Sequence, residues 1–490
     1  MASAKLSPAR KAALSVLDEA RKRDGYARDV ADSSHAIRAL DLRDAGLARH
    51  LVLGVTAAEG CLDELLDRFL AKPNKVAPRV RIALRIAAFE LLYRDVPAEI
   101  AVSQGVELVR FAARNAASLG NAVLRKVAAA RDDYLAALDT DESFREVVRH
   151  ARMAGLPVWL TGEIADSIGV AGIDSLAASE LDPAPNAVHI NARQGLNSAD
   201  SNNATDSNAP NTEGASYPLP GCIAPADVRP YIASGAFDRA EVVASDAHAQ
   251  LIATAATRPG SCLEIGAGRG TKTYIMASQA VRAGFERNHV ALDLYEAKCR
   301  QNLERLERAG VQHVKAIAGD ACDLDIALAA LDGEGKGEYH ITGERSPAGK
   351  RRLFDTVFVD APCSGTGTIR RHSEIPWRLQ PNDIDRDLPA LQLAMLCQAA
   401  TRVASGGELF YATCSVLRQE NERVVTAFLA SEQGAAFACV PVSEAMIFSH
   451  PDFAPAAALL RNGENERGMF QSIPAPNAFD GHFCARFIRR

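Results

Sequence analysis

The chain has 490 residues, 48% of them hydrophobic and 24% charged, which is an ordinary globular composition with enough length for two or three separate cores. Its formal net charge of −6 argues against indiscriminate nucleic-acid binding, because that binding depends on phosphate neutralisation by Lys and Arg. Residues 1–150, however, carry 24 Lys and Arg against 21 Asp and Glu, while residues 151–490 carry 31 against 40. A weakly basic face in the front part is therefore expected.

Membrane and metal chemistry find no support in the sequence. Residues 1–10 hold no apolar segment before a cleavage site, and no later stretch approaches about 18 uninterrupted apolar residues. The ten cysteines form no Cys-x-x-Cys pair and no Cys/His cluster at zinc-ligand spacing. We therefore expect a cytoplasmic protein in a reducing environment, without a metal and without a membrane partner.

The front of the chain is predicted to be helical. Apolar residues recur at helical spacing, and the pattern predicts an all-helical domain over residues 1–150. On periodicity alone these apolar residues form the core stripes of a helix bundle. The pattern occurs in residues 8–20, 47–69, 80–92, 103–114 and 119–130.

Residues 151–250 are interpreted as a linker and a small α/β subdomain for RNA recognition. Within them, residues 197–216 have almost no large apolar side chains, so they cannot bury enough area to offset the entropy of ordering. A disordered insertion is predicted there. A second polar stretch, residues 333–352, is predicted to be a surface loop between two strands.

From residue 260 onward, short β-rich segments alternate with helical ones. This alternation is typical of a parallel, doubly wound, Rossmann-like α/β domain, which we expect over residues 251–490, with ligands at the carboxyl ends of its strands. The predicted strands are 261–265, 289–294, 314–318, 354–360 and 408–412, and the predicted helices are 272–283, 296–309, 323–332 and 388–404.

A glycine-rich turn follows the first of these strands, where a ligand must approach the backbone closely. Three ligand classes compete for it, and both the dinucleotide and the P-loop patterns fail at Thr271. The P-loop pattern fits every other position from Gly266 to Thr273, and the strand that ends at Asp360 resembles its second motif. An acidic-x-Gly-x-Gly-x-Gly turn suits S-adenosylmethionine better. Its residues are Glu264, Gly266, Ala267, Gly268, Arg269, Gly270 and Lys272.

Two later carboxylates support the methyl-donor interpretation. Asp293 ends the second predicted strand, where it can accept the ribose hydroxyls, and Asp320 follows the third, beside the expected adenine amino group. The alternative is that Asp293 and Asp320 merely terminate their strands and bind no ligand.

Two cysteines decide between these ligand classes. Cys363, in Asp360-Ala361-Pro362-Cys363, and Cys414, in Thr413-Cys414-Ser415, each follow the end of a predicted core strand. A free cysteine is usually buried and structural. Two of them on the ligand side of the sheet, beside a carboxylate and a glycine-rich turn, indicate a reactive site instead.

These motifs resemble the Sun family of RNA 5-methylcytosine methyltransferases, and the resemblance extends over nearly the whole chain. Residues 80–126 look like the NusB-like helical domain that precedes the catalytic domain in the family's bacterial 16S rRNA enzymes. Residues 156–159 and 479–485 resemble the linker and the closing strand. The resemblance implies a monomeric enzyme that uses S-adenosylmethionine to methylate cytosine C5 in RNA, with small-subunit 16S rRNA as substrate.

The resemblance also implies the residue roles. Cys414 would add as a thiolate to C6 of cytosine, because C5 alone is a poor nucleophile. Asp360 would contact or protonate N3, and it also lies beside the cofactor; Cys363 would assist breakdown of the adduct. The target base must leave any stack. Contacts to phosphate or base are expected from Arg370, Arg371 and His372.

The first motif departs from the family's usual Asp-Leu-Cys-Ala-Ala-Pro-Gly-Gly-Lys-Thr string and keeps only its final Lys272 and Thr273. Cofactor binding is still expected, because backbone groups make most of the contacts there. Three alternatives stay open: a tRNA substrate, a P-loop NTPase, and a catalytically silent RNA-binding assembly factor.

Overall fold

The computed structural model describes residues 6–193, 215–329, 331 and 351–490. Its contacts divide the chain into two compact units. Unit 1 comprises Met1–Pro183, Thr368–Gln380 and Pro474–Pro476, and unit 2 comprises Ala184–Gly367, Pro381–Ile473 and Asn477–Arg490. The division into 1–150, 151–250 and 251–490 remains a prediction.

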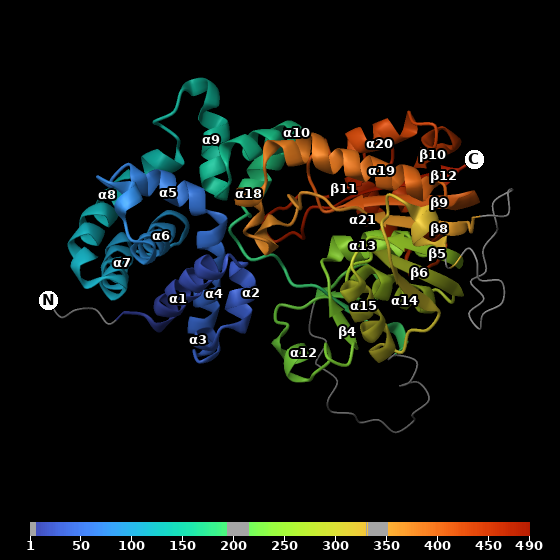
Figure 1. Ribbon diagram of the computed structural model, residues 1–490, viewed down its shortest axis with the longest axis horizontal. Coiled ribbons are helices and arrows are strands. Elements are labelled where there is room, and N and C mark those ends of the chain that lie inside the picture. Colours follow the sequence, from blue (N-terminus) through green and yellow to red (C-terminus); the bar gives the residue numbers. More distant parts are fainter. Residues whose placement is uncertain (1–5, 194–214, 330, 332–350) are drawn as a thin grey trace. The chain divides into compact units, whose positions relative to one another are not determined.

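Unit 1 is helical throughout its described elements, as predicted for the front of the chain (Figure 1). Helix α1 starts at Pro8, whose fixed φ suits the first turn, and it buries Ala9, Ala13 and Leu17 on one stripe. The α-helices of this unit are α1 (Pro8–Arg23), α2 (Ala27–Ser33), α3 (His35–Arg38), α4 (Leu42–Ala57), α5 (Glu59–Asp67), α6 (Pro78–Tyr93), α7 (Ala98–Ala112), α8 (Ala117–Leu135), α9 (Glu142–Ala154), α10 (Val158–Ala177) and α18 (Ile375–Arg378). Short 3-10 turns lie at Pro73–Lys75, Arg114–Ala116 and Ile369–Arg371.

Helix α18 belongs to unit 1 although it follows the cysteine motif at Cys363 in sequence. The indole Nε1 of Trp377 donates to the carbonyl of Ala57 at 2.6 Å, and Glu374 accepts the backbone N–H of Ala27 at 2.7 Å. The segment Thr368–Gln380 is therefore packed against the helices that begin the chain.

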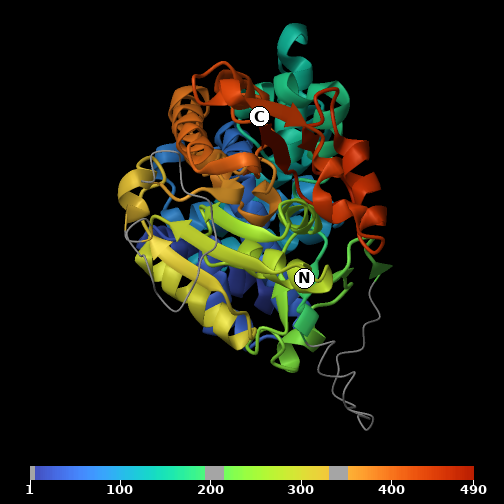
Figure 2. The same ribbon diagram turned by 90° about the vertical axis from the view of Figure 1, so that its right-hand side faces the viewer.

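Unit 2 is built on an eight-stranded sheet with the order β10-β12-β9-β8-β5-β6-β7, and β11 pairs with β12. Figure 2 shows the green and yellow strands of this sheet side by side. The strands are β5 (Gly260–Ile265), β6 (Arg287–Asp293), β7 (Val314–Ala318), β8 (Phe354–Asp360), β9 (Val403–Thr413), β10 (Phe437–Val440), β11 (Phe470–Gln471) and β12 (Phe483–Arg489).

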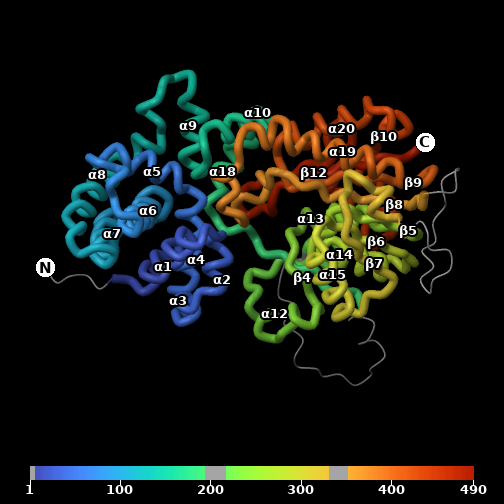
Figure 3. Tube along the Cα trace, viewed as in Figure 1, coloured from blue at the N-terminus to red at the C-terminus, as the bar shows by residue number. Residues whose placement is uncertain are grey.

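The five predicted strands are present and run parallel, with helices between them along the trace in Figure 3. The α/β prediction is confirmed, but the sheet is mixed, because β12 pairs antiparallel with β9 and extends the sheet beyond the parallel set. Chain order changes direction between β5 and β8, and such a switch point is where doubly wound sheets bind ligands.

Helices cover both faces of this sheet. Phe358 and Phe410 point to one face and pack with α13 and α14, whereas Val357 and Val359 point to the other and pack with α19 and α20. This alternation follows from the two-residue period of a strand. The helices of unit 2 are α12 (Arg229–Ala233), α13 (Ala247–Ala255), α14 (Thr271–Arg282), α15 (Glu296–Arg308), α16 (Leu324–Ala327), α19 (Leu388–Ala400), α20 (Glu422–Leu429) and α21 (Ala454–Gly463).

A small antiparallel sheet with the order β2-β3-β1-β4 precedes the large one in sequence. Its strands are β1 (Val188–Ile190), β2 (Ala215–Ser216), β3 (Cys222–Ala224) and β4 (Val242–Ala244). The predicted disordered insertion included the two residues of β2, which are paired with β3 instead. Its remaining residues, 197–214, lie outside the described residues, as do 333–350 of the predicted surface loop.

Among the helices of the described residues, none combines the length and the apolar character that a membrane crossing requires.

Candidate active site

Two adjacent strand ends bring the two cysteines together. Strands β8 and β9 are parallel neighbours, with Asp360 opposite Ala412, so their carboxyl ends lie side by side. Cys363 and Cys414 follow these ends, and their Sγ atoms are 3.3 Å apart. The backbone N–H of Cys414 also points to the Cys363 sulfur at 3.3 Å. The sequence predicted that both cysteines follow strand ends on the ligand side of the sheet, and the adjacency of β8 and β9 brings them into contact.

The two thiols are electrostatically unequal. The hydrogen bond from Cys363 lowers the pKa of Cys414, and the charges of His482 and Lys272 lower it further, against the effect of burial. The same hydrogen bond, together with burial, raises the pKa of Cys363 well above its ordinary value. These opposite shifts favour the thiolate on Cys414 over the thiolate on Cys363.

Buried polar side chains hold the two cysteine loops. Glu420 is fully buried, and its carboxylate accepts the backbone N–H of Ser364 at 2.8 Å and the amide of Gln392 at 3.0 Å. Gln392 donates at 2.9 Å to the carbonyl of Pro362, the residue before Cys363. Asn421 accepts from Thr413 at 2.6 Å, next to Cys414. Glu420 and Asn421 thus anchor the loops that carry Cys363 and Cys414.

Lys272 connects the glycine-rich turn to the second motif. Its Nζ lies 2.6 Å from Oδ2 of Asp360, and the two side chains are 19% and 29% exposed. Burial alone would lower the pKa of Lys272, but the neighbouring Asp360 raises it, so the ammonium stays charged. A Cβ at Gly266 would collide with the carbonyl oxygen of Asp360, so only glycine allows this close approach.

The predicted cofactor residues divide into an accessible and an interior set. Asp293 accepts the backbone N–H of Gly268 at 2.9 Å, which joins the end of β6 to the turn. Asp320 and Arg269 are exposed, and Ala267 is buried.

Glu264 points inward: its Oε2 accepts from Thr273 at 2.6 Å and lies 2.9 Å from His289. Gly270 ends the turn as the N-cap of α14.

Sequence reasoning gave no role to several residues that surround the cysteines. Glu420 and Asn421 were not singled out in the sequence. His482 and Asp246, which are far apart in sequence, form a buried pair with Nε2 and Oδ1 3.5 Å apart. The resemblance of residues 479–485 to a closing strand was a signal for the position of His482 but not for its role.

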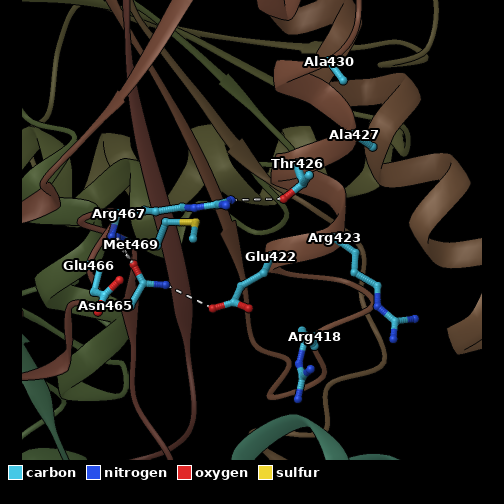
Figure 4. A pocket seen from close by; sticks show the side chains of 10 residues that line it. All are labelled: Arg418, Glu422, Arg423, Thr426, Ala427, Ala430, Asn465, Glu466, Arg467 and Met469. Atoms are coloured by element: carbon cyan, nitrogen blue, oxygen red, sulfur yellow. Dashed lines mark hydrogen bonds between the residues drawn. The ribbon is translucent and has the colours of Figure 1, made fainter.

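A separate surface hollow of about 720 Å³ lies beside α20 (Figure 4). Arg467 donates to Thr426 across it, and Asn465 donates to Glu422. Neither cysteine lines this hollow. Within the described part of the chain, no group of three or more His, Cys, Asp or Glu side chains is placed to hold a metal ion.

Two regions of the chain match models of known protein families. Residues 255–488 match the model of the 16S rRNA methyltransferase RsmB/F family, and residues 7–129 match the NusB family. A Bacillus subtilis protein named "Probable ribosomal RNA small subunit methyltransferase B" is 27% identical and spans 99% of this chain and 100% of its own length. Ribosomal RNA small subunit methyltransferase B of Sodalis glossinidius is 28% identical over 92% of this chain and 91% of its own.

The crystal structure of PH0851 has the same fold, with a TM-score of 0.65 and 19% identity over 98% of each chain. The resemblance predicted from the cysteine motifs and from residues 80–126 is confirmed by both family matches. The chain therefore resembles the RsmB/F family of 16S rRNA methyltransferases over residues 255–488 and the NusB family over residues 7–129.

Proposed function

We propose that this protein transfers a methyl group from S-adenosylmethionine to C5 of a cytosine in 16S rRNA, through a covalent bond between Cys414 and C6. The observation that carries the proposal is the pair of sulfur atoms 3.3 Å apart at adjacent strand ends, with opposite shifts in pKa. A single nucleophile would need no second thiol so close to it.

In the proposed reaction, the Cys414 thiolate forms the bond to C6, and the C5–C6 π electrons move onto C5. Asp360 faces N3 of the cytosine, and the Lys272 ammonium donates a hydrogen bond to that carboxylate. C5 would take the methyl group as its bond to the sulfonium sulfur breaks. A base then takes the C5 proton, and the electron pair of that C–H bond re-forms the C5–C6 double bond and expels the Cys414 sulfur as a thiolate. Cys363 touches Cys414 and is placed to assist this elimination.

The residues present fit S-adenosylmethionine. Gly268 has a positive φ of 57°, and a Cβ there would meet nothing within 4 Å, so the turn opens toward free space. Oε1 of Glu264 is buried without a hydrogen-bond partner in the described residues. Asp293 would hold the ribose hydroxyls and Asp320 the adenine amino group, while the backbone of Gly266–Gly270 would hold the rest. The cofactor, when bound, supplies an electrophilic methyl group.

Leu294 and Tyr295 strengthen this assignment. They follow Asp293 directly and are 60% and 57% exposed. An adenine ring beside Asp320 would cover such surface, so we include both residues in the proposed cofactor site.

The proposed substrate is small-subunit rRNA in the cytoplasm, since the full-length relatives carry names of small-subunit rRNA methyltransferases. Arg370, Arg371 and His372 are proposed to contact this RNA. Arg370 also donates to the carbonyl of Ala475 at 3.4 Å, and the carbonyl of Arg371 accepts from Arg28, so this segment is partly fixed within unit 1.

The test is trapping of the covalent intermediate on 16S rRNA. Cys363→Ala should form the adduct and transfer the methyl group but fail to release the RNA, which gives a protein–RNA band on denaturing electrophoresis. Cys414→Ala should give no band and no methylation while still binding S-adenosylmethionine. Cys439→Ala, at a half-buried cysteine of β10, is the matched control and should behave as wild type.

Other results would change the proposal. A band from Cys414→Ala and none from Cys363→Ala would reverse the two roles. Methylation of tRNA, but not of 16S rRNA, by the wild-type protein would replace the proposed substrate. Failure to bind S-adenosylmethionine, with RNA binding intact, would indicate a silent assembly factor, and binding of ATP instead would indicate an NTPase.

A further inference from the structure

His482 lies at the strand end next to that of Cys414. Thr413 of β9 pairs with Phe483 of β12, so Cys414 and His482 are the residues directly beyond this pair on two adjacent strands. The backbone of Gly367 joins the two strand ends, because its N–H donates to the Cys414 carbonyl at 2.9 Å and its carbonyl accepts from Gly481 at 2.8 Å.

Asp246 holds this imidazole from the neighbouring helix. It is the N-cap of α13, where it accepts the backbone N–H of His248 at 2.9 Å and that of Asp480 at 3.0 Å. Its Oδ1 lies 3.5 Å from Nε2 of His482, and the two side chains are only 7% and 8% exposed. Nε2 of His482 has no hydrogen-bond partner in the described part of the chain. A buried carboxylate needs a cation beside it, and His482 is placed to supply one.

The groups that face His482 are Asp246 and His248 from the start of α13, Lys272 from α14, and Cys414 after β9. Lys272 is already paired with Asp360, and burial lowers the pKa of His248, so neither balances Asp246. Burial alone would lower the pKa of His482 as well, but Asp246 outweighs burial and raises it. A protonated His482 would carry its positive charge at the strand end next to Cys414.

We propose that His482, held by Asp246, is a positioning residue whose imidazolium stabilises the thiolate of Cys414. No proton moves between the two: the imidazolium stays protonated, and the sulfur keeps the electron pair with which it attacks C6. The inference rests on the proposed role of Cys414 as nucleophile, but thiolate formation is measurable without RNA, cofactor or turnover.

The experiment is the pH dependence of alkylation by iodoacetamide in the full-length protein, resolved by peptide. Trypsin releases Cys414 in residues 403–418 and Cys363 in residues 353–370, and each peptide contains a single cysteine. The wild-type midpoint for Cys414 should fall below the ordinary thiol value of about 8.5. His482→Gln should raise that midpoint by about one unit and leave the limiting rate at high pH within about twofold.

Three further variants separate charge from packing. Asp246→Asn should shift the midpoint in the same direction as His482→Gln, and His482→Lys should restore it toward the wild-type value. His189→Gln removes another buried imidazole of unit 2, bound to Gln250 and Ser278, and should leave the midpoint unchanged.

The inference is overturned if the wild-type midpoint is that of an ordinary thiol, if His482→Gln leaves it in place, or if His189→Gln shifts it equally. Because the assay needs no methyl transfer, a wild-type midpoint that depends on His482 would support the inference even if the adduct test of the proposed function failed.

Discussion

At the scale of single residues, the most informative contact is the one between Lys272 and Asp360. The Lys272 ammonium reaches from the glycine-rich turn to the second motif, with its Nζ 2.6 Å from Oδ2 of Asp360. Lys272→Met should lower the single-turnover rate of methyl transfer about a hundredfold, because a buried donor that orients Asp360 is lost. Lys272→Arg should retain part of the rate. Lys315→Met, in β7, serves as the control, and an equal loss there would show a general defect.

The lowered pKa of Cys414 has a consequence for the pH profile. Below that pKa the sulfur is protonated and cannot attack C6, and above it the thiolate is complete. The rate of adduct formation should therefore rise with pH and level off below about pH 8.5, earlier than for an ordinary thiol. Single-turnover rates of adduct formation, measured from about pH 5.5 to about pH 9.5, test this expectation. A rate that still climbs tenfold per unit above pH 8.5 would contradict it.

At the scale of elements, Glu420, in the turn before α20, joins Gln392 of α19 to the loop that carries Cys363. Glu420→Gln keeps the size of the side chain but turns an amide toward the donors of Ser364 and Gln392. The free energy of unfolding should fall by about 1–3 kcal/mol, and the rate of methyl transfer should fall with it. Glu422→Gln is the matched control, because this half-buried carboxylate of the same segment accepts a hydrogen bond from Asn465, which lies outside the cysteine loops. Its effect should stay within about 0.5 kcal/mol in thermal unfolding.

At the scale of the whole molecule, the segment Thr368–Gln380 lies within the methyltransferase sequence but packs as part of unit 1. A deletion of residues 1–150 should weaken RNA binding, and it also removes the partners of Trp377 and Glu374. A point variant tests the segment more sharply. Trp377→Ala loses one hydrogen bond of about 1 kcal/mol and the packing of the indole ring against Gly60, so the open population of the segment should rise at least about fivefold.

Tryptic cleavage after Arg370 and Arg371 measures that opening. The cleavage rate of Trp377→Ala should rise at least about fivefold, while Trp159→Ala, the other tryptophan of the chain, should leave the rate unchanged. A cleavage rate that is equal in wild type and Trp377→Ala would show that the segment is held by other contacts, such as the carbonyl of Arg371 with Arg28.

The sequence by itself determined the helical front, the five parallel strands and the place of Cys363 and Cys414 at strand ends. These features depend on periodicity and on local motifs, which a single sequence records directly. It did not determine that β12 runs antiparallel beside β9, that Ala215–Ser216 pair with β3, or that Thr368–Gln380 pack with the front helices. It also left His482 and Asp246 without a role, although they are 3.5 Å apart. Strand pairing and buried ion pairs join residues that are distant in sequence, so only the tertiary structure decided them.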